Sequence, residues 1–406
     1  MRPPSTANPT GRAVRSADRR PSSNRLWAVL CAKPELTVSL VAALTGGLWA
    51  ATSLRQVPDP TLFAEAGRAL FSKQWSDVFS DPQLQVGPLY LAFVGIVAVL
   101  AEVLGVPTEL AVAIVASALI GLGTVLVTRQ ALALQNRQSA VVELGAGLTV
   151  TLAAPLCATA WGGHFEELIT ALLLLIAAHF AARSRYALAG VLIGLAACTK
   201  MWGLLGIGIL LIDVTPTPLV SWVRLRKVLV GLVTAVGVVA LGYVPFVAFG
   251  DVATLAKTWS TAFPAPLALM ANGEPFTFTM RAGQAVCAVA AGGVLAVVGR
   301  RDVRTLWTVP AVTITARLLL DPFVQSYYLA PLLLITAIGV WAMDSSSHHT
   351  RALAVAAAMP VTWLVLTVAG GQLGAVLATV LLTAAVGGLA LVRAAGPLRH
   401  AQPTEG

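Results

Sequence analysis

Residues 164–213 read HFEELITALLLLIAAHFAARSRYALAGVLIGLAACTKMWGLLGIGILLID. The stretch contains apolar runs at Leu168–Ala182, Tyr186–Thr199 and Trp202–Ile212. Charged side chains are confined to the ends of these runs, as expected where burying a charge in hydrocarbon is costly. The runs are too long and too uniformly apolar for the alternating strands of a membrane β-barrel. This pattern predicts α-helices that cross a membrane.

The composition extends this prediction to the whole chain. Hydrophobic residues make up 57% and charged residues 11%, with a mean hydropathy of +0.81, whereas a soluble domain is about 25% charged. We therefore expect an all-α polytopic bundle of about twelve spans. The remaining expected spans are Leu36–Leu54, Leu110–Val127, Ala140–Ala160, Val228–Phe249, Ala282–Gly299, Leu306–Leu320, Tyr327–Met343, Ala352–Gly370 and Leu373–Val392.

The placement of lysine and arginine predicts the orientation, because cytoplasmic loops carry an excess of both. Residues 1–34 are basic and rich in Pro and Ser, so we expect a disordered cytoplasmic tail and no signal peptide. A membrane domain follows at 35–393, and a second cytoplasmic tail at 394–406. The loops at 55–86, 161–167, 250–281 and 321–326 then lie on the outer face of the cytoplasmic membrane. Cytoplasmic turns would carry Arg183, Arg185, Arg224, Arg226, Lys227, Arg300, Arg301, Arg304 and Arg351.

The apolar stretch Val86–Leu104 does not fit this alternation if it crosses the membrane. Arg129 and Arg137 look cytoplasmic, which requires an odd number of crossings between the first outer loop and residue 128. We therefore expect Val86–Leu104 to lie in the interface or to re-enter. If it crosses instead, the short run at Trp202–Ile212 would be the span to drop.

The cysteines and the net charge point to no further chemistry. Cys31, Cys157, Cys198 and Cys287 show no paired spacing, so we interpret them as packing residues. Most of the +9 net charge lies in the tail and the cytoplasmic loops. There it sets the topology and meets anionic membrane lipids, and nucleic acid is not an expected partner.

The first outer loop holds a carboxylate and a predicted surface helix. Pro58 and Pro60 should keep the backbone around Asp59 extended. Apolar residues then recur at helical spacing, which is typical of a helix lying on a membrane surface; they are Leu62, Phe63, Ala66, Leu70 and Phe71. Glu65 and Arg68 fall on its other faces, and Trp75 and Phe79 are candidate anchors at headgroup level. A solvated loop carboxylate is the alternative interpretation of Asp59.

A second polar cluster lies just before the apolar run Leu168–Ala182. His164, Glu166 and Glu167 follow a glycine pair, and an acid at a helix N-terminus is favourable with the helix dipole. Capping explains one acid but not two acids beside a histidine. The spacing matches no strong metal signature, so we expect neither a metal nor another cofactor, with a metal bound by the two ligand types of H-x-E-E as the alternative.

Two cations stand inside apolar surroundings. Lys200 lies between apolar runs and is best placed at a helix end facing the outer side, bound to an anion. Arg317 lies near the outer end of a later helix, and interfacial anchoring is its alternative role. Tyr327, in the run QSYY at 325–328, would contact a sugar or form part of the aromatic belt.

These features together resemble a known enzyme family. The order is an acid opening the outer loop (Asp59), an AGRAL helix, a Gly-Pro restart at 87–88, GGHFEEL at 162–168, RSRY, AGVLIGLAACTK and a late Ser-Tyr-Tyr. It resembles the GT-C fold membrane glycosyltransferases that use polyprenyl-phosphate sugars, in particular the mannosyltransferase-type, family 87-like actinobacterial branch. The resemblance covers about residues 35–330. It implies that Asp59 is the general base, that 163–167 contacts donor or acceptor, and that Lys200 faces the lipid phosphate.

The residues suit an inverting sugar transfer, and the resemblance implies that the sugar is mannose and the acceptor a lipid or a glycan. One carboxylate must accept the acceptor's hydroxyl proton, with Asp59 the first candidate, Glu65 the second, and His164 or Glu166 the third. The leaving phosphate needs its charge matched, which Lys200, Arg68 or Arg317 would do. The alternative is a transporter or flippase of a lipid-linked or polar solute, although the acids gather at one surface and not at midplane. A third alternative is an inactive relative that acts as a partner subunit.

Overall fold

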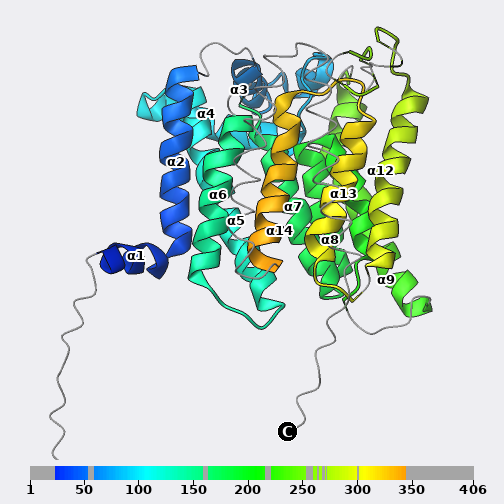
Figure 1. Cartoon of the computed structure of the whole chain (residues 1–406). Coiled ribbons are helices and arrows are strands. Elements are labelled where there is room, and N and C mark those ends of the chain that lie inside the picture. The colour runs from blue at the N-terminus through cyan, green and yellow to red at the C-terminus, as the bar shows by residue number, and fades with distance from the viewer. Residues whose placement is uncertain are drawn as a thin grey trace, which may run out of the picture.

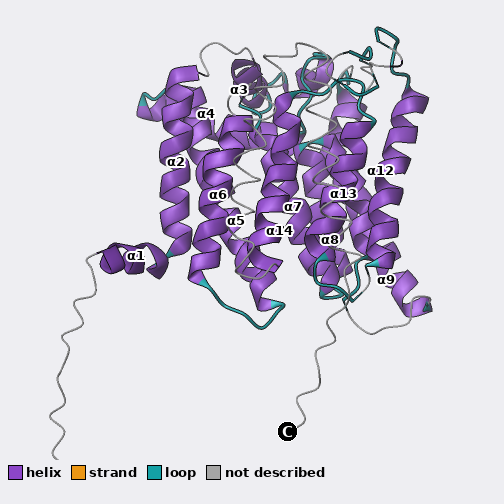
Figure 2. Cartoon of the chain, in the orientation of Figure 1, coloured by secondary structure: helices purple, strands orange, loops and turns teal. Residues whose placement is uncertain are grey.

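The computed structural model describes residues 23–53, 59–158, 163–214, 221–252, 259–262, 265–267, 270, 272–299 and 301–343. In this part of the chain the regular structure is helical, and extended backbone pairs at an isolated bridge between Ser260 and Pro275 (Figure 2). The predicted all-α class is confirmed. The expected spans at 352–370 and 373–392, residues 1–22 and the tail at 394–406 lie outside the described residues.

The helices along the long axis of the bundle coincide with the expected spans (Figure 1). They are α2 (Pro34–Ser53), α5 (Thr108–Ala133), α6 (Ala140–Ala158), α7 (Phe165–Ala182), α8 (Tyr186–Thr199), η3 (Met201–Leu211), α9 (Trp222–Phe249), α12 (Phe278–Val298), α13 (Thr305–Leu319) and α14 (Ala330–Met343). Among the described residues, α2, α5, α7, α9 and α12 are long and apolar enough to cross a membrane, and the others are shorter apolar helices.

Helix α7 occupies the centre of the bundle. Of the 18 residues of this helix, 78% are buried. The helix packs against α5, α8, η3, α13 and α14. Leucine and alanine cover nearly all of its faces, as expected for a helix surrounded by other helices. Because α7 is central, the acids in its first turn are placed inside the bundle at one end.

The segment η3 explains how a short run can traverse the bundle. Its 11 residues form a 3-10 helix, which rises about 2.0 Å per residue against 1.5 Å in an α-helix. It therefore covers about 20 Å, from Lys200 at one end to Asp213 near the other. Asp213 there lies 3.5 Å from Arg224, in the first turn of α9. Trp202–Ile212 is thus not the span to drop.

Helix α4 (Pro88–Leu104) does not cross the bundle. At its start the Gly87 amide donates to Thr199 O (2.9 Å), at the end of α8, and beyond its last turn the chain enters α5 at Thr108. Both neighbours lie at the same end of the bundle, where α4 lies beside the surface helix α3 (Asp59–Ala69) (Figure 1). The structure therefore agrees with the expectation that Val86–Leu104 does not cross, and its interfacial or re-entrant placement stays a prediction.

The first outer loop differs from the sequence expectations at two points. Asp59 and Pro60 begin helix α3, because proline is tolerated in a first helical turn, where no amide donor is needed. Trp75 and Phe79, in the 3-10 helix η2 (Trp75–Ser80), pack edge-on against Phe246 of α9 at 5.7 and 4.8 Å. They hold this loop on the bundle and are not headgroup anchors.

A helix also begins inside the stretch expected to be a tail. Helix α1 (Ser23–Ala32) lies across the end of α2 (Figure 1). Its residues Leu30 and Cys31 pack against a cluster that includes Val38 and Val125, and Thr37 Oγ1 donates to Leu30 O (3.1 Å). Apolar side chains in the basic segment therefore dock it on the bundle.

Glycines set the distance between α3 and α4. A Cβ on Gly67 would lie 2.7 Å from Gly95 N and 2.8 Å from Leu91 O, so the two backbones touch. This contact holds α3, which begins with Asp59, against α4.

We expect Gly67→Ala to lower the free energy of unfolding by about 1–3 kcal/mol, the usual cost of overpacking, despite the better helix propensity of alanine. Unfolding in mixed detergent micelles measures the effect. Gly283→Ala in α12 is the control, because nothing lies within 4 Å of its added Cβ. Equal stabilities for the two variants would contradict a tight α3–α4 contact.

The two ends of the bundle differ in charge. The site end carries α3, the start of α7 with His164, and the end of α8 with Lys200 (Figure 1). The basic end carries the turns with Arg183, Arg185 and Arg224 and the starts of α6 and α13. The loops expected on the outer face therefore share one end.

Candidate functional site

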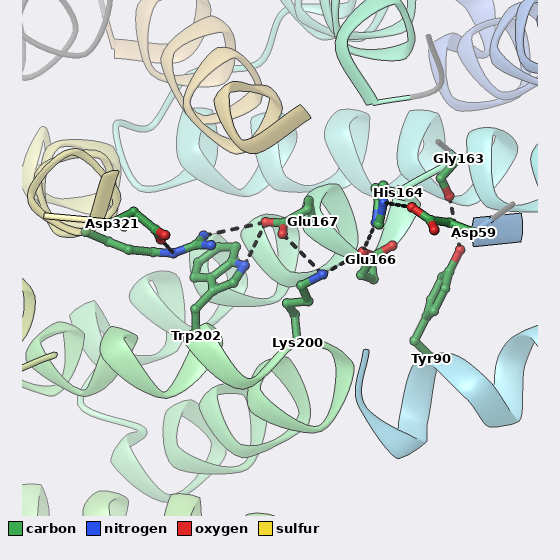
Figure 3. Close-up of polar contacts among 10 residues, drawn as sticks. Asp59, Tyr90, Gly163, His164, Glu166, Glu167, Lys200, Trp202 and Asp321 are labelled. Atoms are coloured by element: carbon green, nitrogen blue, oxygen red, sulfur yellow. Dashed lines mark hydrogen bonds and ion pairs between the residues drawn. The ribbon is translucent and has the colours of Figure 1, made fainter. Parts of the chain in front are cut away.

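The site begins at a partly exposed carboxylate and continues inward through a buried histidine (Figure 3). Asp59 Oδ2, at the start of α3, lies 3.0 Å from His164 Nε2. His164 Nδ1 lies 2.6 Å from Glu166 Oε1. The Asp59 side chain is 41% exposed, whereas those of His164 and Glu166 are 5% and 0% exposed. Both ring nitrogens thus face carboxylates that lie 105 and 2 residues away in sequence.

Lys200 joins the two acids of α7. Its Nζ donates to Glu166 Oε1 at 2.9 Å and lies 3.5 Å from Glu167 Oε1. Glu167 Oε2 accepts a hydrogen bond from Trp202 Nε1 at 2.7 Å (Figure 3). Lys200 is held at the junction of α8 and η3 in extended backbone, which ends α8 and turns the side chain toward α7. The lysine is therefore buried and paired with carboxylates.

Arg317 extends the chain to α13. Its Nη1 lies 3.7 Å from Glu167 Oε2, and its Nε lies 3.5 Å from Asp321 Oδ2. The guanidinium carbon lies 5.0 Å from the ring centre of Trp202 and 4.8 Å from that of Tyr328. Such stacking suits a planar guanidinium and fixes its orientation.

These ionisable groups form one continuous chain of alternating charge. The members in spatial order are Asp59, His164, Glu166, Lys200, Glu167, Arg317 and Asp321. With His164 protonated, each carboxylate lies beside at least one cation, which makes burial of so many charges tolerable. The chain then holds four carboxylates against three cations, a net charge of −1.

Aromatic rings enclose the histidine. Tyr327 stacks on the His164 ring with centroids 3.8 Å apart and planes at 13°, and Phe63 of α3 meets it edge-on at 5.4 Å. Tyr90 of α4 donates a long hydrogen bond of 3.5 Å to the Gly163 carbonyl. The ring is fixed between α3, α7 and the segment η4 (Ser326–Leu329), so Asp59 is oriented by a rigid neighbour.

Several buried polar atoms of the chain have no hydrogen-bond partner in the described part of the protein. They are Glu166 Oε2, Glu167 Oε1 and Arg317 Nη1. Buried polar atoms are nearly always satisfied, so unpaired ones mark a place where a ligand or water completes the site. Arg317 Nη1 is the donor in this set and suits an anionic oxygen.

The environment of His164 favours its cationic form. Burial and the positive charge of Lys200 would lower the pKa of His164. The Glu166 carboxylate and the hydrogen bond to Asp59 raise it by more than this. The pKa of His164 therefore lies above its ordinary value. The raised pKa increases the share of the cationic form of His164, whose ring lies beside Asp59.

We expect the stabilising effect of His164 to disappear as the pH rises. A group whose pKa is raised in the folded state stabilises the protein fully at a pH below its pKa in the unfolded chain, about 6.5 for histidine. This stabilisation is lost as the pH rises through the pKa in the folded state. The difference in thermal midpoint between the wild type and His164→Gln should therefore be largest near pH 6 and shrink toward pH 9. A difference that grows with pH would contradict this assignment.

The structure brings most of the predicted site residues together. Asp59, His164, Glu166, Glu167, Lys200, Arg317 and Tyr327 belong to the chain or contact it directly. Glu65 instead lies exposed on α3. Arg68 donates to Glu102 Oε1 at 2.6 Å and to Thr108 Oγ1 at 2.8 Å, so it ties α3 to α4 and α5.

Sequence reasoning missed Trp202 and Asp321 as members of the site. A signal for Trp202 was its position two residues after Lys200, and for Asp321 its position one helical turn after Arg317. No group of three or more His, Cys, Asp or Glu side chains suited to a metal ion occurs among the residues that were described.

Comparison with known proteins gives a distant likeness only. No protein-family model matches the sequence, and no curated protein matches it. The fold is similar to the crystal structure of ArnT from Cupriavidus metallidurans in the apo state, with a TM-score of 0.48 and 19% identity over 92% of this chain and 73% of that chain. For ArnT from the same organism bound to undecaprenyl phosphate, the TM-score is 0.45 and the identity 18%, over 90% and 78% of the chains. A likeness of this strength assigns no activity to this chain.

Proposed function

We propose that the protein is an integral membrane glycosyltransferase that moves a sugar, mannose in the first instance, from a polyprenyl-phosphate carrier to a lipid or glycan acceptor on the outer face of the cytoplasmic membrane. The observation that carries the proposal is the position of Asp59. It is the accessible end of a buried chain of charges at one end of a membrane-embedded bundle.

Asp59 is the proposed general base. As the acceptor oxygen bonds to the anomeric carbon, Asp59 takes the hydroxyl proton, and the bond from that carbon to the phosphate oxygen breaks. A single base acting on the face opposite the leaving group gives inversion at that carbon. His164, whose Nε2 lies 3.0 Å from Asp59 Oδ2, orients the carboxylate.

Lys200 and Arg317 are the proposed partners of the leaving phosphate. The electron pair of the breaking bond stays on the lipid phosphate, which is a weak base and needs no protein acid. Its charge is matched by preoriented cations in a site of low dielectric. Arg317 Nη1 lacks a hydrogen-bond partner among the described residues, and its planar fork suits a phosphate oxygen.

The remaining predicted residues take supporting roles in the proposal. Glu166 and Glu167 hold Lys200 in place, and Tyr327, stacked on His164, offers an aromatic face to the sugar. Arg68 has only a positioning role in the proposal, because its ion pair with Glu102 holds α3 against α4. Glu65 remains a proposed acceptor contact on the exposed face of α3.

A transfer assay tests the proposal. Purified protein in lipid nanodiscs is given polyprenyl-phosphate mannose with a radiolabelled sugar, together with a membrane lipid and glycan extract as acceptor. We expect label to leave the carrier and appear in an acceptor fraction. Labelled carrier that crosses proteoliposome membranes without being consumed would instead support the transporter alternative. Absence of both outcomes would leave the inactive-partner interpretation.

A further inference from the structure

A pocket opens at the basic end of the bundle, far from the charged chain of the site end. It lies between the start of α8 and the start of α9 and has a volume of about 550 Å³, which is in the range of ligand-binding pockets. Its lining combines a cationic rim with an apolar wall. The rim residues are Arg185, Arg226 and Lys227, and the wall residues are Leu188, Trp222, Val223 and Val230.

Glycines bring the two sides of the pocket together. A methyl group on Gly190 of α8 would run into the carbonyl oxygen of Gly231 of α9, so the two helices touch through their backbones. Ser184, at φ 57°, makes the tight turn that ends α7 and starts α8 at Tyr186. Helices α8 and α9 both start at this end, so Arg185 and Arg226 converge although they lie 41 positions apart in the sequence.

The rim cations differ from Arg129 and Arg224, which also lie at the basic end. Arg129 pairs with Glu35 and Glu143 at 2.7 and 2.8 Å, and Arg224 lies 3.5 Å from Asp213. Within the residues that the structure describes, Arg185, Arg226 and Lys227 are exposed and form no ion pair. Three exposed cations without an ion pair among the described residues therefore line one pocket.

Two residues of the apolar wall, Leu188 and Val230, lie further toward the middle of the bundle than the rim. Val230 lies one helical turn beyond Arg226, about 6 Å along α9, and Leu188 occupies the matching position on α8. Leu188, Val223 and Val230 are 46%, 64% and 46% exposed, and Trp222, at the start of α9, is 75% exposed. Cations near the end of the bundle and aliphatic side chains one turn further in, at Leu188 and Val230, match the order of headgroup and acyl chain in a phospholipid.

We infer that this pocket binds one anionic phospholipid from the leaflet at the basic end. Its phosphate lies on Arg185, Arg226 and Lys227, and an acyl chain lies along Leu188 and Val230. The bound lipid joins the starts of α8 and α9 and so supports the elements that end in Lys200 at the opposite end. The site is independent of the proposed transfer reaction, because none of its residues belongs to the charged chain.

Native mass spectrometry of the full-length protein tests the inference. The protein is released from nanodiscs that contain equal amounts of phosphatidylglycerol and phosphatidylcholine. The wild type should retain one phosphatidylglycerol in preference to phosphatidylcholine. The variant Arg226→Gln/Lys227→Gln should bind it roughly 30-fold more weakly, at about 5-fold for each cation near an anionic headgroup.

The matched control removes the same charge elsewhere at this end. Arg137→Gln/Arg183→Gln also loses two cations, both exposed and outside the pocket, and should retain the lipid as the wild type does. Equal loss in both variants would show a general surface attraction and overturn the inference, as would equal retention in all three proteins. Displacement of the lipid by millimolar inorganic phosphate would assign the rim to a soluble anion and also overturn it.

Discussion

Replacing Asp59 with asparagine is expected to lower the rate of sugar transfer by roughly 100- to 10,000-fold at saturating substrate, the usual contribution of a general base. Asparagine keeps the size of the side chain and a hydrogen-bond acceptor for His164, but it cannot accept the hydroxyl proton. Donor binding should change little, because the phosphate is assigned to Lys200 and Arg317. The measurement is transfer of labelled mannose by protein in nanodiscs, with donor affinity determined separately.

The control for this prediction makes the same chemical change in the same loop. Asp77→Asn alters an exposed carboxylate of η2 that lies outside the charged chain, and it should leave the rate within a factor of two or so of the wild type. Glu65→Gln tests the second candidate base on α3. If Asp59→Asn transfers sugar at the wild-type rate while Glu65→Gln does not, the base has been assigned to the wrong carboxylate.

Replacing Lys200 with methionine is expected to lower the free energy of unfolding by about 3–5 kcal/mol. The variant leaves Glu166 and Glu167, whose side chains are 0% exposed, without the cation that lies 2.9 and 3.5 Å away. The main cost is an uncompensated buried charge, not the loss of a favourable contact. Unfolding in mixed micelles measures the effect.

Two further variants separate this explanation from a general effect of removing a cation. Lys200→Met/Glu166→Gln removes both charges of the pair and should recover part of the loss. Arg68→Met breaks the pair with Glu102, whose side chains are 37% and 57% exposed, and should cost less than about 1 kcal/mol. A loss as large in Arg68→Met as in Lys200→Met would contradict the special role of burial.

Much of the fold followed from the sequence because the bilayer restricts the possible structures. Each apolar run had to be a helix, and the alternation of basic turns predicted that Val86–Leu104 does not cross, in agreement with the position of α4 at one end of the bundle. The helix at Leu62–Phe71 was recognisable from its spacing. The behaviour of Trp75 and Phe79 was not, because an aromatic residue in a loop packs equally well against lipid headgroups or against another helix.

The candidate site was predictable where its residues are close in sequence. His164, Glu166 and Glu167 lie within one turn at the start of an apolar helix. Ionisable residues are rare beside such helices, so their presence indicates a functional site. Arg68 and Arg317 were both candidate cations for the leaving phosphate, and the sequence does not distinguish them. In the structure Arg68 faces Glu102 and Thr108, outside the charged chain. Which direction a side chain takes depends on the rotation of its helix, and for α3 the Gly67–Gly95 contact sets that rotation.

The sequence by itself predicted a helical membrane protein with acids gathered at one end and basic turns at the other, because hydrocarbon excludes unpaired charge and unpaired backbone. Only the tertiary structure decided that Asp59, His164, Lys200 and Arg317 form one chain of alternating charge, and that Arg185 and Arg226 share one pocket. Those groups come from helices far apart along the chain. Their meeting depends on which small residues allow helices to touch, a property of packed surfaces that no local pattern specifies.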